Sequence, residues 1–504
     1  MSDPSWPPAQ WPPEEGHDGS RRDVLGAVRT LVLLLILGAV PAVGLFLAHR
    51  AAEARAEQGV PVAPVPAPAS GQVVTPLASL RRTPQTVSQT LATEALVASL
   101  APIGDQVAPG SCLVVAVDGT PVFDDAGPTS VLPASNMKLV TAAVGLEVLG
   151  PEHRFTTEVR SAAPPSGGVV AGDLYLVGGG DPVLGTEPYV PAAAAQVTYP
   201  QPYVTPLEAL ADQIVATGVT QVTGSVLGDD SRYDAERFVP SWPASYATSR
   251  EAGPLGALLV NDGAESLRPL RSAADPAVHG AAVLTQLLRD RGVAVGGTPG
   301  RTAGPAPGTA LSAIQSRPLG DLLGEMLTTS DDNTAELLLK EIGAVAAGAG
   351  TRPAGLAVVQ AKLAEWGIPG DGLALVDGSG LDRGNRLTCG ALQGVLRHVG
   401  GASPVADGLP IAGQTGTLHD AFAGNPAVGR LRAKTGTLRD AKALSGFVDG
   451  PDGIRHVSFS FIQNGADAEA LALPIWDALG RALTAYPAAP PADQLDPEPA
   501  APPP

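Results

Sequence analysis

The chain has 504 residues, including 60 glycines, 50 prolines and only 4 % aromatic residues, and this length allows about three domains. Its formal net charge is −18, and its basic residues do not gather into a stripe. Because nucleic-acid binding requires a locally basic surface, we expect no nucleic-acid partner.

An apolar segment near the N-terminus is the first localisation signal. No charged residue occurs between Leu31 and Ala48, and a milder apolar run begins near Val24. This length suits a transmembrane helix of about 20 residues better than a signal-peptide core of about 7–15. The sequence therefore predicts a cytoplasmic tail (1–23), a single-pass membrane anchor (24–48) and an exported main body. A cleaved signal peptide is the alternative.

Two segments rich in alanine and proline flank the main body. Residues 49–84 are typical of a semi-rigid linker, and residues 487–504 of a disordered tail. Neither composition supports a packed core.

The chain has two cysteines, Cys112 and Cys389, both in the part expected to be exported. A disulfide persists in oxidising surroundings, so pairing is plausible, and two buried free thiols are the alternative. The seven histidines are scattered and form no metal-binding pattern, so neither a metal nor a cofactor is expected.

Strand-like and helix-like runs alternate in the main body. Residues 111–123 read as two strands around an Asp118–Gly119 turn, which is a hairpin signature. The run that starts at Ser135 leads into a helix with valines four residues apart. Residues 155–310 differ, because they contain short strands, many Gly and Pro turns and few long helices.

Helical patterns return at residues 319–348 and 355–367, and residues 431–465 read as consecutive antiparallel strands before a closing helix. The pattern predicts one α/β (α+β) domain built from residues 85–154 and 311–486. A large β-rich insertion, residues 155–310, splits it.

A serine and a lysine stand three residues apart at the start of the first helix, in "LPASNMKLV". Ser135 and Lys138 share a helix face. Serine needs a neighbouring base to act as a nucleophile, and a lysine whose pKa is lowered can be that base. Free N–H groups at the helix start can stabilise an oxyanion. Alone, the pair could equally be a helix cap and a solvated charge.

Two later motifs change this interpretation. "TSDDN" contains Ser330, and "KTGT" begins at Lys434 on an expected strand. A lysine, a hydroxyl and a glycine on an edge strand can clamp a carboxylate, and Gly436 would let a substrate backbone approach closely. Ser-x-x-Lys, Ser-Asp-x and Lys-Thr-Gly, in that order, are the motifs of penicillin-binding proteins and serine β-lactamases.

The chain resembles the low-molecular-mass class C penicillin-binding proteins, the D-alanyl-D-alanine carboxypeptidase/endopeptidase family. The resemblance runs from about Ser111 to Leu483 and also rests on "PASNMKLVTAAVGLEVLG", "GDLYLVGGGDP", "VDGSGLDRGNRLT" and "RLRAKTGTLRDAKALSGFV". The wide gap between Lys138 and Ser330 fits the extra domains of that family. The resemblance implies a transpeptidase-like domain, an antiparallel sheet flanked by helices, with a β-rich insertion between the first two motifs.

The resemblance also implies a mechanism. Ser135 would attack the peptide carbonyl between two D-alanines, Lys138 would accept its proton, and Ser330 would relay the proton to the leaving group. Peptidoglycan stem peptides are the expected substrates, and β-lactams are expected to acylate the serine and leave slowly.

Substrate binding follows from the same resemblance. Lys434 and Thr435 would hold the terminal carboxylate, and the backbone N–H groups of Ser135 and Thr437 would form the oxyanion hole. The expected site residues are, for catalysis, Ser135, Lys138, Ser330, Asp332 and Lys434, and, for substrate binding, Asn333, Thr435, Gly436 and Thr437.

One position departs from the family pattern, which is Ser-x-Asn followed after two residues by Ala-Glu. Aligned on Ala335–Glu336, the asparagine position is Asp332, with Asn333 one place later. An acid beside Lys138 would favour the charged lysine and make it a poorer base. Three alternatives are open: Asn333 swings in, the acid is tolerated, or activity is reduced.

Two further motifs are interpreted as structural. "QTGTL" (Gln414–Leu418) mimics the third motif but lacks its lysine, and "DGSGL" (Asp377–Leu381) lacks the wider Gly-x-Ser-x-Gly elbow. Besides a DD-peptidase, two functions stay open: a β-lactamase or esterase of the same catalytic class, and a catalytically weak scaffold that binds cell wall.

Overall fold

The computed structural model describes residues 46–50 and 85–488. The chain divides into two compact units, 1–76 and 77–504, and all elements described below belong to the second. The predicted anchor (24–48) lies almost entirely outside the described residues, as do most of the linker and of the C-terminal tail.

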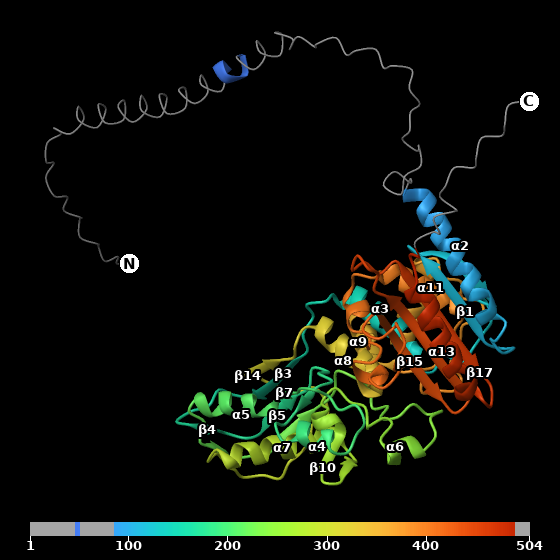
Figure 1. Ribbon diagram of the computed structural model, residues 1–504. Coiled ribbons are helices and arrows are strands. Elements are labelled where there is room, and N and C mark those ends of the chain that lie inside the picture. Colours follow the sequence, from blue (N-terminus) through green and yellow to red (C-terminus); the bar gives the residue numbers. More distant parts are fainter. Residues whose placement is uncertain (1–45, 51–84, 489–504) are drawn as a thin grey trace, which may run out of the picture. The chain divides into compact units, whose positions relative to one another are not determined.

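A five-stranded antiparallel sheet in the order β15-β16-β17-β1-β2 is the centre of the split domain (Figure 1). Asp118 and Gly119 both have positive φ, 48° and 75°, as the tight turn between β1 and β2 requires. The predicted hairpin and the three consecutive C-terminal strands are confirmed. The strands are β1 (Cys112–Val117), β2 (Thr120–Asp125), β15 (Leu431–Leu438), β16 (Ala441–Val448) and β17 (Val457–Asn464).

Helices cover both faces of this sheet. Every residue of β1 is buried, and alternate side chains point to opposite faces. Leu113 and Val115 pack with α2 (Gln85–Gly104) and α13 (Ala468–Thr484), the predicted closing helix. Val114 packs on the other face, whose helices are α3 (Met137–Leu149), α8 (Leu319–Thr329), α9 (Asp332–Ala347), α10 (Arg352–Glu365), α11 (Cys389–Val399) and α12 (Pro404–Asp407).

None of the helices in the described ranges is by itself long and apolar enough to cross a membrane. The bent pair α9 and α10 meets that test together, by length and composition only.

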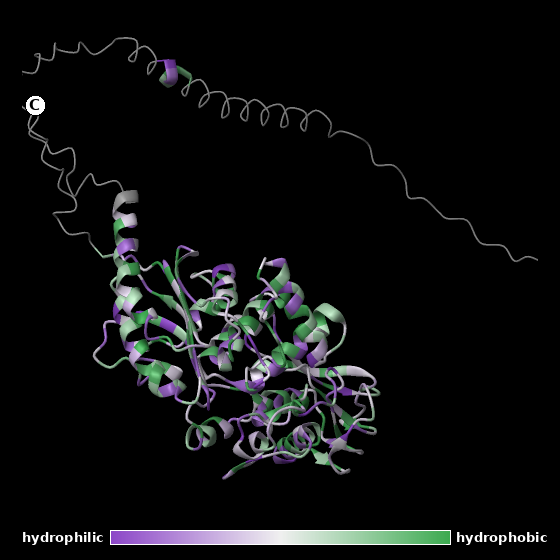
Figure 2. Cartoon of the chain, turned by 90° about the vertical axis from the view of Figure 1, so that its right-hand side faces the viewer, coloured by the Kyte–Doolittle hydropathy of each residue, from purple (hydrophilic) through white to green (hydrophobic). Residues whose placement is uncertain are grey.

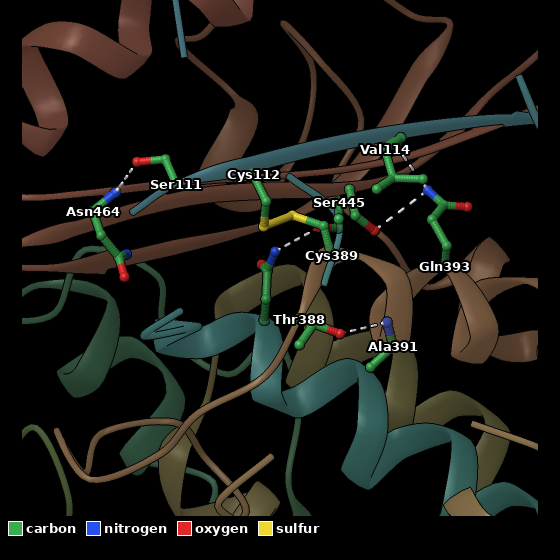
Figure 3. The surroundings of a disulfide bond; sticks show 12 residues. Ser111, Cys112, Val114, Thr388, Cys389, Ala391, Gln393, Ser445 and Asn464 are labelled. Carbon is green, nitrogen blue, oxygen red and sulfur yellow. Dashed lines mark hydrogen bonds between the residues drawn. A yellow bond between two sulfur atoms is a disulfide. The ribbon is translucent and has the colours of Figure 1, made fainter. Parts of the chain in front are cut away.

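A disulfide joins Cys112, the first residue of β1, to Cys389, the first residue of α11 (Figure 3). The two Cα atoms are 5.9 Å apart. Thr388 caps α11 by accepting a hydrogen bond from Ala391 N at 2.9 Å, and Gln393 Nε2 donates to Val114 O at 3.2 Å. Covalent and polar contacts therefore hold α11 on β1.

The insertion has a mixed sheet, β13-β9-β5-β3-β14, and a smaller parallel sheet, β12-β8-β4. Their apolar side chains share a core with α5 (Leu207–Ala216) and α7 (Pro276–Asp290). The strands are β3 (Thr156–Ser161), β4 (Val169–Val170), β5 (Leu174–Val177), β8 (Gln221–Val222), β9 (Val226–Asp229), β12 (Ala294–Val295), β13 (Gly300–Arg301) and β14 (Thr309–Gln315). Smaller elements are β6 (Leu184–Gly185), α4 (Tyr189–Ala194), β7 (Thr205–Pro206), α6 (Ser245–Ser249), β10 (Ala264–Leu267) and β11 (Leu270–Ser272).

The structure corrects two features predicted for the insertion. The description as β-rich with few long helices is incomplete, because its parallel strands need crossover connections, and α5 and α7 lie in two of them. The predicted boundary at residue 310 is also too early, since β14 pairs with β3 until Gln315 faces Thr156. Hydrophobic residues occur throughout the elements of both domains (Figure 2), and each domain has its own core.

Candidate active site

A cavity of about 500 Å³ lies between the split domain and the insertion and is lined by residues from all three motifs. The split domain supplies hydroxyls, carboxylates and a strand edge. The insertion supplies aromatic and charged side chains that local sequence patterns did not reveal. The lining includes Ser135, Ser330, Asp332, Thr435 and Thr437 from the first, and Tyr189, Tyr199, Gln201, Arg250 and Asp262 from the second.

Ser135 sits in a short 3-10 turn, η1 (Ala134–Asn136), that leads into α3. Ala134 has a φ of 47°, and Asn136 is buried with its Nδ2 donating to Ser445 Oγ at 2.8 Å. A Cβ at Gly436 would come within 2.9 Å of Pro133 O. Gly436 therefore lets β15 approach the serine turn, and the approach of a substrate backbone to it stays a prediction.

Lys138 is fully buried beneath Ser135. Its Nζ donates to Asp332 Oδ1 at 2.5 Å, to Ser379 O at 2.7 Å and to Ser135 Oγ at 3.3 Å. Ser379 belongs to the "DGSGL" loop, and the N–H groups of Gly378 and Ser379 both donate to the buried Glu336 carboxylate. The loop is thus structural, and it also positions the lysine.

Asp332, and not Asn333, occupies the asparagine position of the second motif. Burial raises the pKa of the Asp332 carboxyl to about 6, although Lys138 acts in the opposite direction. Asn333 also lines the cavity, but the insertion occupies both ends of its amide. Gly253 N donates to its Oδ1 at 2.8 Å, and its Nδ2 donates to Asp262 Oδ1. In the structure Asn333 therefore does not swing toward the lysine, and its role in substrate binding stays a prediction.

The second lysine of the site, Lys434, is also fully buried. Its Nζ donates to Ser330 Oγ at 2.8 Å and to Thr435 O at 2.9 Å. Burial, and then the nearby charge of Lys138, hold the pKa of Lys434 well below its usual value. Ser330 itself adopts a left-handed conformation, with φ of 64°, at the C-terminal end of α8.

The "QTGTL" segment lies at the site, against expectation. It forms the 3-10 turn η3 (Gly416–Leu418), and Thr417 lines the cavity. Thr435 Oγ1 donates to Thr417 Oγ1 at 2.7 Å. The sequence predicts a structural strand-turn for this segment, and the structure has a 3-10 turn there instead; its structural role stays a prediction. The only sequence signal for a place at the site was the similarity of this segment to the third motif. That similarity did not predict the contact between Thr417 and Thr435.

A serine at the start of a helix touches a buried lysine, while a second serine touches a lysine on the edge strand of an antiparallel sheet. This arrangement defines a serine acyl transferase of the penicillin-binding and β-lactamase class.

Comparisons with known proteins identify the family within this class of serine acyl transferases. Residues 105–271 and 264–475 match the D-Ala-D-Ala carboxypeptidase 3 (S13) family. The chain is 32% identical over 457 residues to a D-alanyl-D-alanine carboxypeptidase of Actinomadura sp. (strain R39), which covers 74% of this chain and 81% of the relative. It is also 32% identical over 462 residues to carboxypeptidase DacB of Mycolicibacterium smegmatis (88% and 94%).

The chain therefore belongs to the D-Ala-D-Ala carboxypeptidase 3 (S13) family and is a serine peptidase of that class, as the resemblance predicted. Penicillin binding protein 4 (dacB) from Haemophilus influenzae has the same mixed α/β fold. Its TM-score is 0.62 at 21% identity, over 76% of this chain and 97% of that one.

Proposed function

We propose that the protein cleaves peptidoglycan stem peptides ending in D-Ala-D-Ala through an acyl-enzyme on Ser135. The contact between Ser135 Oγ and Nζ of the buried Lys138, 3.3 Å apart at the wall of the cavity, carries this proposal. The family and the carboxypeptidases named above support the choice of substrate.

The first step is attack by Ser135 Oγ on the carbonyl carbon between the two D-alanines while its proton passes to Lys138. For this the lysine must first be a neutral amine. Asp332 Oδ1 accepts a hydrogen bond from Lys138 Nζ at 2.5 Å, and this contact opposes that change. Backbone N–H groups of Ser135 and Thr437 stabilise the oxyanion.

The leaving D-alanine needs a proton, and Ser330 is the group that delivers it. It relays the proton that Lys138 took from Ser135, and its own hydroxyl is held by a hydrogen bond from Lys434 Nζ at 2.8 Å. The terminal carboxylate is held by the Thr435 hydroxyl on the edge of β15, with the buried Lys434 next to it in the strand. Water then hydrolyses the acyl-enzyme, and a β-lactam forms an adduct on Ser135 that is hydrolysed slowly.

We also propose that the enzyme is exported and held at the cell membrane by the apolar segment between Leu31 and Ala48. The disulfide between Cys112 and Cys389 supports an oxidising compartment. Protease treatment of intact cells should digest the main body, whereas a cytoplasmic marker should survive.

The test is the intact mass of the protein after exposure to a β-lactam, together with release of D-alanine from a D-Ala-D-Ala peptide. We expect one covalent adduct and turnover for the parent, and neither for Ser135→Ala. Fast β-lactam hydrolysis would instead favour a β-lactamase. If adduct and turnover are both absent, the result supports the scaffold function. The acid at position 332 is the sequence feature that favours this alternative.

A further inference from the structure

The segment before "QTGTL" covers part of the edge of β15. Ile411 forms an antiparallel bridge with Arg432, Ala412 N donates to Leu431 O at 2.9 Å, and Ala433 N donates to Pro410 O at 3.0 Å. In the described part of the chain, no strand other than β16 pairs with β15 beyond this point. The edge that stays open to a ligand therefore begins at Thr435, which lines the cavity and contacts Thr417.

The turn that carries Thr417 is held on both sides. A Cβ at Gly416, whose φ is 52°, would come within 2.1 Å of Thr328 O, so only glycine lets the turn approach the end of α8. Leu418 is fully buried in the core beneath α13. Thr417 therefore lies between the second and third motifs. On one side is Thr328, two residues before Ser330 of the second motif, and on the other is Thr435 of the third.

The two hydroxyls at this point contain two hydrogens, and their mutual bond uses one. Within the described chain, Thr417 Oγ1 has no hydrogen-bond partner besides Thr435. One O–H therefore stays available to an acceptor in the cavity, whichever threonine donates to the other. A hydroxyl that is held by a second hydroxyl is already oriented when an anion binds. The hydrogen bond between the two hydroxyls also polarises the remaining O–H, which strengthens its hydrogen bond to the anion.

We propose that Thr417 is a positioning residue for the substrate carboxylate: it orients the Thr435 hydroxyl and completes the clamp at the closed end of the β15 edge. The inference rests on the proposed DD-peptidase function and adds to it. It makes "QTGT" a fourth motif, one that selects peptides with a free terminal carboxylate.

The test compares two peptides, one ending in D-Ala-D-Ala with a free carboxylate and the same peptide with a C-terminal amide. Thr417→Val removes the hydroxyl and keeps the branched shape. We expect it to lower kcat/KM for the acid about 3–10-fold, which corresponds to the loss of one ordinary hydrogen bond. We expect the value for the amide to stay unchanged, so that the preference for the acid falls. Thr417→Ser should restore that preference.

Thr415→Val is the matched control. The Thr415 hydroxyl accepts a hydrogen bond from Ile411 N at 2.9 Å in the same segment and does not line the cavity. If Thr417→Val keeps the preference for the acid, the proposed role of Thr417 is overturned. It is also overturned if Thr415→Val lowers that preference by the same factor. Wild-type protein that cleaves neither peptide and forms no β-lactam adduct would overturn the proposed function instead.

Discussion

Asp332 is the residue that most distinguishes this site from its family pattern. Its carboxylate lies 2.5 Å from Lys138 Nζ, with 13% of its side chain exposed and none of the lysine's. An ion pair this buried favours the charged lysine, whereas nucleophile activation requires the neutral one. The carboxylate therefore raises the cost of acylation.

Asp332→Asn should speed acylation at neutral pH. The variant removes the anion that stabilises the ammonium form of Lys138 but keeps a hydrogen-bond partner of the same shape. We expect about tenfold faster acylation, and a shift of the acidic limb of its pH profile to lower pH by about one unit. Stopped-flow measurements with a chromogenic β-lactam from pH 5 to 9 would show it. Slower acylation with an unmoved limb would mean that the carboxylate is itself the required base.

At the scale of elements, α9 connects the split domain with the insertion through Asn333. Asn333→Ala would leave Gly253 N–H without its partner and Asp262 Oδ1 without the Asn333 donor, with only the longer contact from Arg250 to Oδ2 remaining, at a cost of about 1–3 kcal/mol of unfolding free energy. The insertion loops would also become less ordered along the cavity. We expect KM for a long stem peptide to rise several-fold, whereas acylation by a small β-lactam should change less.

Thermal unfolding and steady-state kinetics check this prediction. Gln286→Ala, on an exposed face of α7, is the control and should leave both unchanged. Equal losses with the peptide and the β-lactam would show that Asn333 supports the catalytic groups rather than the peptide-binding wall.

The disulfide gives a second prediction for the elements, because it holds α11 on β1 across 277 residues of sequence. Replacing Cys112 and Cys389 together by alanine should lower the free energy of unfolding by about 2–5 kcal/mol. The fold should persist at low temperature, with acylation of Ser135 retained. Denaturant titration of the variant measures the loss of unfolding free energy, and a larger loss or none would contradict the prediction. A mass-spectrometric assay at 10 °C measures the acylation of Ser135.

Elements with local signals could be predicted from the sequence, and long-range contacts could not. Asp118–Gly119 predicts its hairpin, because few residue types adopt the positive φ angles that the tight turn requires. The place of Thr417 depends on a close approach to Thr328, 89 residues earlier, and no local pattern records such a distance. The contacts of Asn333 could not be predicted for the same reason, since its partners Gly253 and Asp262 lie in the insertion.

At the scale of the whole molecule, buried acids line the region where the two domains meet. Burial raises the pKa of Glu325, which is 7% exposed on α8, to about 8, and that of Asp262 in the insertion to about 7. The charge of Asp331 raises the pKa of both further. The protein therefore holds protons there that the unfolded chain has already released.

Stability should consequently fall as pH rises. A carboxyl with a raised pKa contributes its full stability below its unfolded pKa and loses it as pH rises through the folded value. For these groups the loss spans about pH 4 to 8. We expect a melting temperature several degrees lower at pH 8.5 than at pH 5.5. Glu325→Gln should flatten this dependence, and an equally steep dependence in that variant would exclude Glu325 as a cause.

The pairing of β1 with β17 has a consequence for synthesis of the chain. Cys112–Val117 pairs with β2 at once, but its second partner strand is present only when Val457–Asn464 has been made, so the nucleophile is present long before the complete sheet that supports it. The insertion, whose sheets are complete by Gln315, can fold first on the emerging chain. A nascent chain halted before residue 457 would thus carry a folded insertion and an inert serine, and the enzyme gains activity only once its last strand has emerged.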